Sequence, residues 1–153
     1  MSFDLKRQLV AQLVESSRLL RNHIEHRAKT RGTTRAQWIV LFRLRQQEGL
    51  SQVDLADVLE LQPISLVRLL DRLVEHGLLE RRHDPKDRRA NRLFLTASGR
   101  RLVDDLDSLR DSIASELLHD VPTPAIETSL ETLREIKDRI KGLAEPPGHI
   151  AAK

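Results

Sequence analysis

Residues 62–99 read QPISLVRLLDRLVEHGLLERRHDPKDRRANRLFLTASG, and they contain the strongest structural signals of the chain. The first part predicts a helix, because Pro63 suits a first helical turn and Gly77 can adopt the left-handed conformation that ends a helix. We expect the apolar side of this helix to be formed by Ile64, Val67, Leu70, Leu73 and Val74.

Two short strands are predicted after this helix. Leu78 to Arg82 and Arg92 to Leu95 have strand character, and residues 83–91 between them are too polar for a core. From Arg81 to Arg92 the chain has six Lys or Arg and two Asp or Glu, a density that suits contact with phosphates. The pattern predicts a β-hairpin with a long basic tip, and a solvated charged turn is the alternative.

A second short helix is predicted immediately before residue 62. Ser51, with Asp54 three residues later, is typical of a helix N-terminus. The apolar residues of this short helix, before the break at Gln62-Pro63, are Val53, Leu55, Ala56, Val58 and Leu59. Two short helices joined by a tight turn are typical of a helix-turn-helix.

Longer helices are predicted on both sides of this region. Apolar residues recur at helical spacing from Asp4 to Lys29, and Thr34 with Gln37 forms a capping box for a helix that Gly49 ends. Thr96 caps a long helix, and a last helix follows Val121-Pro122-Thr123-Pro124. The apolar seams of these two helices are Leu102, Leu106, Leu109, Ile113 and Leu117, and then Ile126, Leu130, Leu133, Ile136, Ile140 and Leu143.

The predicted fold class is mostly α, with an α+β winged helix-turn-helix. We expect residues 34–103 to form the DNA-binding domain, residues 1–33 and 104–145 to form a helical dimerisation region, and residues 146–153 to be a disordered tail. The outer helices have more apolar surface than one such chain can cover, which favours a symmetric homodimer.

Composition excludes several classes of function. The chain has no cysteine, so thiol sensing and disulfides are excluded, and it contains no phosphate-binding loop or nucleophile elbow that would indicate an enzyme. No apolar run is long enough for a membrane helix, so we expect a cytoplasmic protein. Residues 1–103 have 20 Lys or Arg against 12 Asp or Glu, whereas residues 104–145 have 5 against 11, which places a nucleic-acid surface in the first part.

The segment Asp84 to Gly99, DPKDRRANRLFLTASG, resembles the wing signature of MarR-family regulators, in which an acidic-x-Arg wing leads into a Leu-Thr-x-x-Gly helix start. Residues 66–78 are similar to the recognition helix of that family and its exit. Together with residues 62–65 and the segment around Trp38, these motifs look closest to the SlyA-like branch. The resemblance covers residues 5–143 and implies a DNA-binding transcriptional repressor that acts as a homodimer on a palindromic operator.

Candidate DNA contacts follow from this arrangement. Gln62, Ser65 and Arg68 are spaced at three along one face, and Arg68 suits a bidentate contact with guanine. Ser51 and Gln52 suit phosphate contact, although Ser51 could serve only as a helix cap, and Arg68 could instead pair on the surface with Asp71. Arg88 or Arg89 is expected to enter the minor groove, and the family pattern implies that Asp87 orients the guanidinium of Arg89.

The resemblance also implies a small-molecule pocket between the dimerisation helices and the DNA-reading domain. The matching positions are Arg18, Arg21, Gln37, Trp38 and Phe42. An aromatic wall near arginine would suit an aromatic carboxylate or an acyl-thioester. Trp38 and Phe42 could equally be core residues, and Arg18 could be solvated. The SlyA-like pattern often has histidine where this chain has Gln37.

A metal site and a protein-binding function are two further alternatives. His23 and His26 are three residues apart on a helix, but only Glu25 lies nearby as a further ligand, so no metal site or cofactor is predicted. A winged helix that binds proteins without specific DNA binding is the alternative function, which the arginine-dense wing disfavours. For the DNA-binding function, we expect two recognition helices about 34 Å apart and an effector that changes this spacing.

Overall fold

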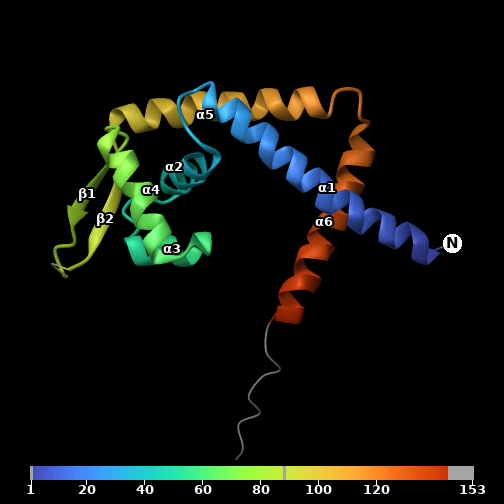
Figure 1. Cartoon of the computed structure of the whole chain (residues 1–153), viewed down its shortest axis with the longest axis horizontal. Helices are drawn as coiled ribbons and strands as arrows, with labels where there is room; N and C mark the ends of the chain where they lie inside the picture. Colours follow the sequence, from blue (N-terminus) through green and yellow to red (C-terminus); the bar gives the residue numbers. More distant parts are fainter. Residues whose placement is uncertain (1, 88, 145–153) are drawn as a thin grey trace, which may run out of the picture. The chain divides into compact units, whose positions relative to one another are not determined.

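The computed structural model describes residues 2–87 and 89–144, which form six helices and two strands. The chain divides into two compact units, Met1–Ile113 and Ala114–Lys153. The first contains α1 (Ser2–Lys29), α2 (Arg35–Gln46), α3 (Gln52–Leu59), α4 (Pro63–Glu75), β1 (Leu79–His83), β2 (Asn91–Leu95) and most of α5 (Ala97–Leu117) (Figure 1). The second contains α6 (Thr123–Ala144). The order of elements and the mostly helical winged-helix fold class are confirmed, and the predicted tail, residues 146–153, lies outside the described residues.

The helix ends are set by the predicted capping residues. The Thr34 and Ser51 side chains accept hydrogen bonds from the N–H groups of Gln37 and Asp54 at the starts of α2 and α3. Pro63 is the first residue of α4, and Gly77 follows its last turn with φ +70°. Side-chain and glycine caps satisfy backbone groups that a helix end leaves unpaired, so the local sequence fixes where these helices begin and end.

The predicted end of α2 was wrong. The helix ends at Gln46, and Gly49, with φ +81°, lies three residues beyond it. The Gly49 N–H donates to the Leu93 carbonyl at 2.9 Å, and the Leu93 N–H donates to the Leu50 carbonyl at 3.0 Å. Gly49 therefore belongs to the segment that pairs with β2, and it does not terminate a helix.

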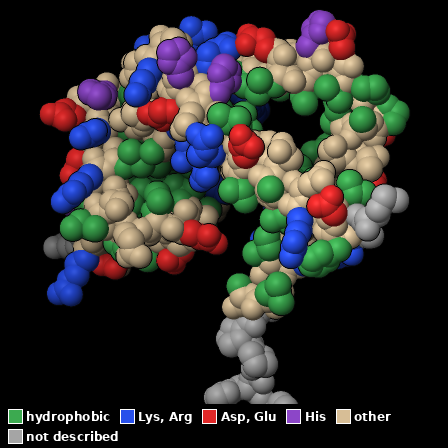
Figure 2. Space-filling model, turned by 45° about the vertical axis from the view of Figure 1, so that its right-hand side comes forward, with side chains coloured by type: hydrophobic (Ala, Val, Ile, Leu, Met, Phe, Trp, Pro, Cys, Tyr) green, Lys and Arg blue, Asp and Glu red, His purple; other side chains and the backbone are tan. Residues whose placement is uncertain are grey.

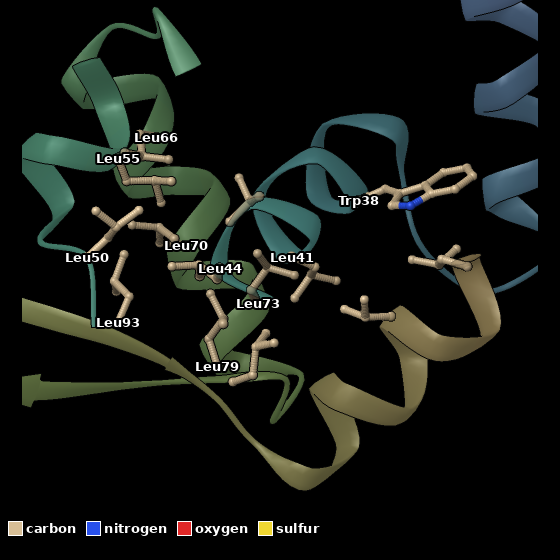
Figure 3. Packing of buried hydrophobic residues seen from close by; sticks show 14 of the residues in the cluster. Trp38, Leu41, Leu44, Leu50, Leu55, Leu66, Leu70, Leu73, Leu79 and Leu93 are labelled. Carbon is tan, nitrogen blue, oxygen red and sulfur yellow. The ribbon is translucent and has the colours of Figure 1, made fainter. Parts of the chain in front are cut away.

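The core of the first unit is built mainly from leucines (Figure 3). On α4 the fully buried residues are Leu66, Leu70 and Leu73, which pack with Leu41, Leu44 and Leu55. Ile64 and Val67 are exposed, so their predicted place on the buried side of this helix was wrong. Two apolar stripes with helical spacing run along α4, and the packing of its neighbours determines which one is covered.

The two strands pair antiparallel, from Leu79 opposite Leu95 to His83 opposite Asn91. The first strand is shifted and the second extended by one residue from the predicted bounds, and residues 84–87 and 89–90 lie in the tip. Leu79, Leu93 and Leu95 point into the core, which fixes the register because a shift of one residue would turn these side chains outward.

The junction between α4, β2 and α5 depends on close backbone packing. The Thr96 hydroxyl donates to the Gly77 carbonyl at 2.6 Å and accepts from the Gly99 N–H at 3.0 Å, so the predicted cap is confirmed. A Cβ atom on Gly99 would lie 2.1 Å from the Leu78 carbonyl oxygen. The Leu-Thr-x-x-Gly motif is therefore explained by a helix start that lies against backbone.

The long outer helices expose apolar side chains. Large apolar residues of α1, including Phe3, Leu5 and Val14, are exposed, and no residue of α6 is buried. Figure 2 shows apolar side chains at the surface among the charged ones. None of the helices in the described ranges is long and apolar enough to span a bilayer. The assignment of residues 1–33 and 104–145 to one dimerisation region and of 34–103 to a DNA-binding domain stays a prediction.

Candidate nucleic-acid interface

The outward face of α4 lies opposite its buried leucines. Ser65 and Arg68 are exposed, whereas Leu66 and Leu70 are at most 1% exposed. Gln62 is the N-cap residue, and its side chain makes no capping hydrogen bond. The three residues predicted to contact bases therefore stand at the surface, and their contact with DNA stays a prediction.

The predicted phosphate ligands on α3 have contacts within the protein. The Ser51 hydroxyl accepts from the Asp54 N–H at 3.1 Å, which is the capping role. The Gln52 side-chain oxygen accepts from the Arg81 Nε at 2.8 Å. Ser51 is only partly exposed, so phosphate contact by this residue would use groups other than the occupied hydroxyl lone pair.

Arg81 connects three elements of the helix-turn-helix and wing. Its guanidinium donates to Gln52 on α3 and, at 2.6 Å, to the Asp71 carboxylate on α4, while its own backbone belongs to β1. A guanidinium can satisfy several acceptors in one plane, which suits this bridging position. Asp71 therefore pairs with Arg81, so the sequence-based alternative of an Arg68–Asp71 pair was wrong.

The wing has fewer available cations than its sequence indicates. Arg82 pairs with Glu80, and its guanidinium carbon lies 4.1 Å from the centre of the Phe94 ring. Arg92 donates from Nε to the Asp84 carboxylate at 3.0 Å. With Arg81 paired to α3 and α4, three of the wing arginines have partners within the protein. Among the described residues of the tip, Lys86 and Arg89 are exposed and have no ion pair.

Aspartates fix the turn at the wing tip. Asp84 accepts from the Lys86 N–H at 2.9 Å, and Asp87 accepts from the Arg89 N–H at 3.0 Å. The Lys86 N–H, and next the Arg92 guanidinium, hold the pKa of Asp84 below its usual value. This contact of Asp87 is with the main chain of Arg89, and the implied orientation of the Arg89 guanidinium by this carboxylate stays a prediction. Arg88, the other predicted minor-groove residue, lies outside the described residues.

A pocket of about 260 Å³ lies between α1, α2 and α5 in the first unit. Trp38 and Phe42 line it together with Ile24 and Ile39, so two predicted ligand residues are brought together. The cations at this pocket are Arg35 and Arg110, and the Arg110 guanidinium carbon lies 4.9 Å from the centre of the Phe42 ring.

The other predicted ligand residues lie elsewhere. Gln37 is buried, accepts the Thr33 hydroxyl hydrogen bond at 2.9 Å and lines a different pocket near Arg72 and His76. Arg18 and Arg21 are exposed on α1 and are not part of the pocket that Trp38 lines. The sequence pattern could not identify Arg35 and Arg110 as residues of this pocket. They come together only because α2 packs against α5.

Residues 33–90 match the model of the MarR family. This segment is therefore similar to the MarR family. One solved MarR-family transcription regulator has a TM-score of 0.88 at 19% identity, over 95% of this chain and 97% of the other. A MarR-family regulator from Rhodococcus sp. RHA1 has a TM-score of 0.74 at 27% identity, over 86% of this chain and 94% of the other. The MepR–DNA complex from S. aureus has a TM-score of 0.70 at 25% identity, over 84% of this chain and 93% of the other.

The matched segment includes the helix-turn-helix and the first half of the wing. The likeness to the MarR family therefore rests on the same residues that build the candidate interface, from Thr33 to Ala90. The solved structures extend the likeness to the outer helices, since they cover most of the chain. The SlyA-like branch stays a hypothesis, supported only by the residues quoted for it above.

Proposed function

We propose that this protein is a MarR-family, sequence-specific DNA-binding transcriptional regulator, without enzymatic activity, that represses from a palindromic operator. The observation that carries the proposal is the exposed face of α4 with Arg68, next to a wing whose tip presents Lys86 and Arg89. One helix for the major groove and one cationic hairpin for the adjacent backbone or minor groove are the two contacts of a winged helix with a duplex. MepR, of similar fold, was solved with DNA, which supports the same use here.

The proposed active form is a homodimer in the cytoplasm. Apolar residues of α1 are exposed, and none of the described residues of α6 is buried. Both helices therefore have apolar stripes that the rest of the chain does not cover. A second copy would cover them by symmetry and would set the two α4 helices about one turn of DNA apart. An operator with two inverted half-sites follows from such a dimer.

The proposed effector is a small aromatic carboxylate or acyl-thioester in the pocket of Trp38 and Phe42. The pocket is mainly apolar, and Arg35 and Arg110 at its edge suit a carboxylate or another anion. These two arginines replace Arg18 and Arg21 as the cations of the proposal. An effector would release DNA only by the difference between its affinities for the DNA-bound and free conformations.

The proposed function is tested by enrichment of random-sequence duplex DNA on the purified protein at two salt concentrations. We expect a palindrome with half-sites about one helical turn apart, bound more weakly at the higher salt because phosphate contacts release counterions. Weak, sequence-blind binding at both salt concentrations would reject specific DNA recognition and would favour a protein partner for the winged helix.

A further inference from the structure

We propose that Ile64 and Val67 read thymine methyl groups in the major groove, so that each operator half-site has a thymine within about two base pairs of the guanine that Arg68 contacts. This inference rests on the proposed function. It adds apolar base contacts to the polar ones that the sequence predicts for Gln62, Ser65 and Arg68 on α4.

The first observation is the exposure of these side chains. Ile64 is 67% exposed and Val67 39% exposed, although the neighbouring Leu66 is only 1% exposed. On α3, Val53 is 71% exposed. A single exposed apolar side chain needs no explanation, but three of them on the two helices of a helix-turn-helix form a local apolar surface.

The second observation is a groove between α3 and α4, which concerns Val67 and not Ile64. Its volume is about 150 Å³, and it is lined by the apolar Val53, Ala56, Pro63, Leu66 and Val67 and by the polar Gln52 and Asp57. Pockets for drug-sized ligands are about 300–1,000 Å³, so the groove suits a much smaller apolar group. The C5-methyl of thymine is the apolar group that base pairs present in the major groove.

The third observation is the relation of Ile64 to Arg68. They are four residues apart on α4, so they lie about 40° apart around the helix and about 6 Å apart along it. Base pairs rise about 3.4 Å, so this separation corresponds to about two base pairs. Arg68 places a positive charge beside the apolar residues. This charge favours binding of DNA to this surface over binding of an apolar protein partner.

The test uses the enriched operator with each thymine replaced in turn by deoxyuridine, which removes only the methyl group. We expect replacement of the contacted thymine to weaken binding about fourfold, from about 0.8 kcal/mol for one buried methyl. In Ile64→Ala, the ratio of affinities for the thymine and deoxyuridine duplexes should fall to about one at one position. In Val67→Ala, the same ratio should fall to about one at a different thymine position.

The matched control is Val58→Ala, because Val58 is 44% exposed on α3 but does not line the groove. It should keep the preference for thymine unchanged. Specific operator binding that is insensitive to deoxyuridine at every position would overturn the inference while the proposed function stands. A preference that survives in both Ile64→Ala and Val67→Ala would also overturn it, and failure to enrich any operator would reject both proposals.

Discussion

Gly99 shows how one residue can be required by packing alone. It has no glycine-specific φ, but its missing side chain allows the start of α5 to approach the Leu78 carbonyl, where a Cβ would lie 2.1 Å away. Thr96 holds the same junction through two hydrogen bonds. The motif that predicted a helix start in the sequence is therefore also the contact that positions α5 against the exit of α4.

Replacement of Gly99 by alanine should destabilise the protein. The added methyl group meets backbone and cannot be accommodated by a side-chain rotation, so we expect a loss of about 1–3 kcal/mol in the free energy of unfolding. The control is Gly142→Ala on α6, where nothing lies within 4 Å of the new Cβ and helix propensity predicts a gain of about 0.5–1 kcal/mol. Denaturant unfolding measures both, and equal stability of the two variants would contradict the packing account.

Arg89 is the described wing-tip arginine with the clearest expected role in DNA binding. Its N–H is held by Asp87, and its guanidinium has no ion pair with the described residues. Arg89→Ala should weaken operator binding and reduce the slope of log affinity against log salt by about 0.9, without loss of thermal stability. Arg139→Ala on α6 is the charge-matched control, because Arg139 lies about 120° around the helix from Leu133 and its ion pair with Glu135 is exposed. An unchanged titration in a gel-shift assay would remove the wing tip from the interface.

At the scale of elements, capping residues and strand signals could be predicted from the sequence, whereas contacts between elements could not. Thr34, Ser51, Pro63 and Thr96 act on backbone within a few residues, so their positions determine helix starts directly. The predicted apolar side of α4 was right at Leu70, Leu73 and Val74 and wrong at Ile64 and Val67. The sequence offers apolar residues with helical spacing on more than one side of this helix. Packing against α2 and α3 selects the stripe of Leu66, Leu70 and Leu73.

The candidate site shows the same limit. The basic composition of the wing was evident in the sequence, but the sequence did not show which arginines are available for DNA. Arg81, Arg82 and Arg92 pair with acidic residues on the helix-turn-helix and within the hairpin. Arg81 in particular bridges residues that are 10 and 29 positions away in sequence. Such pairs depend on the folded geometry, and charge counting assigns all these arginines to DNA.

The wing as an element should respond to pH through Asp84. Its pKa is lowered from 3.8 by the Lys86 N–H and then by Arg92. Because the pKa is depressed in the folded state, the carboxylate stabilises the wing above about pH 3.8, and this contribution is lost as the pH falls through the lower folded value.

Arg92→Ala should therefore raise the pKa of Asp84 towards 3.8 without reaching it, because the hydrogen bond from Lys86 remains. An NMR titration of the Asp84 carboxyl carbon measures this shift. Arg89→Ala serves as the control and should leave the pKa of Asp84 unchanged. An Arg92→Ala variant with the same Asp84 pKa as the parent protein would show that the Asp84–Arg92 pair does not form.

At the scale of the whole molecule, the proposed function requires a dimer. Leu133 is 38% exposed on α6, whose described residues include none that is buried. Leu133→Glu should place a charge in the proposed interface and shift the protein from dimer to monomer. Sedimentation velocity measures the change, with Val58→Glu on α3 as a control that should remain dimeric. A monomeric parent protein, or a dimeric Leu133→Glu variant, would exclude this helix from the interface.

The most direct test of the central claim is the ratio of two dissociation constants, measured at physiological salt for the enriched palindrome and for a scrambled duplex of the same composition. A sequence-specific regulator predicts a ratio of at least about 10³. A ratio close to one would contradict the account, because the protein would then bind DNA through charge alone.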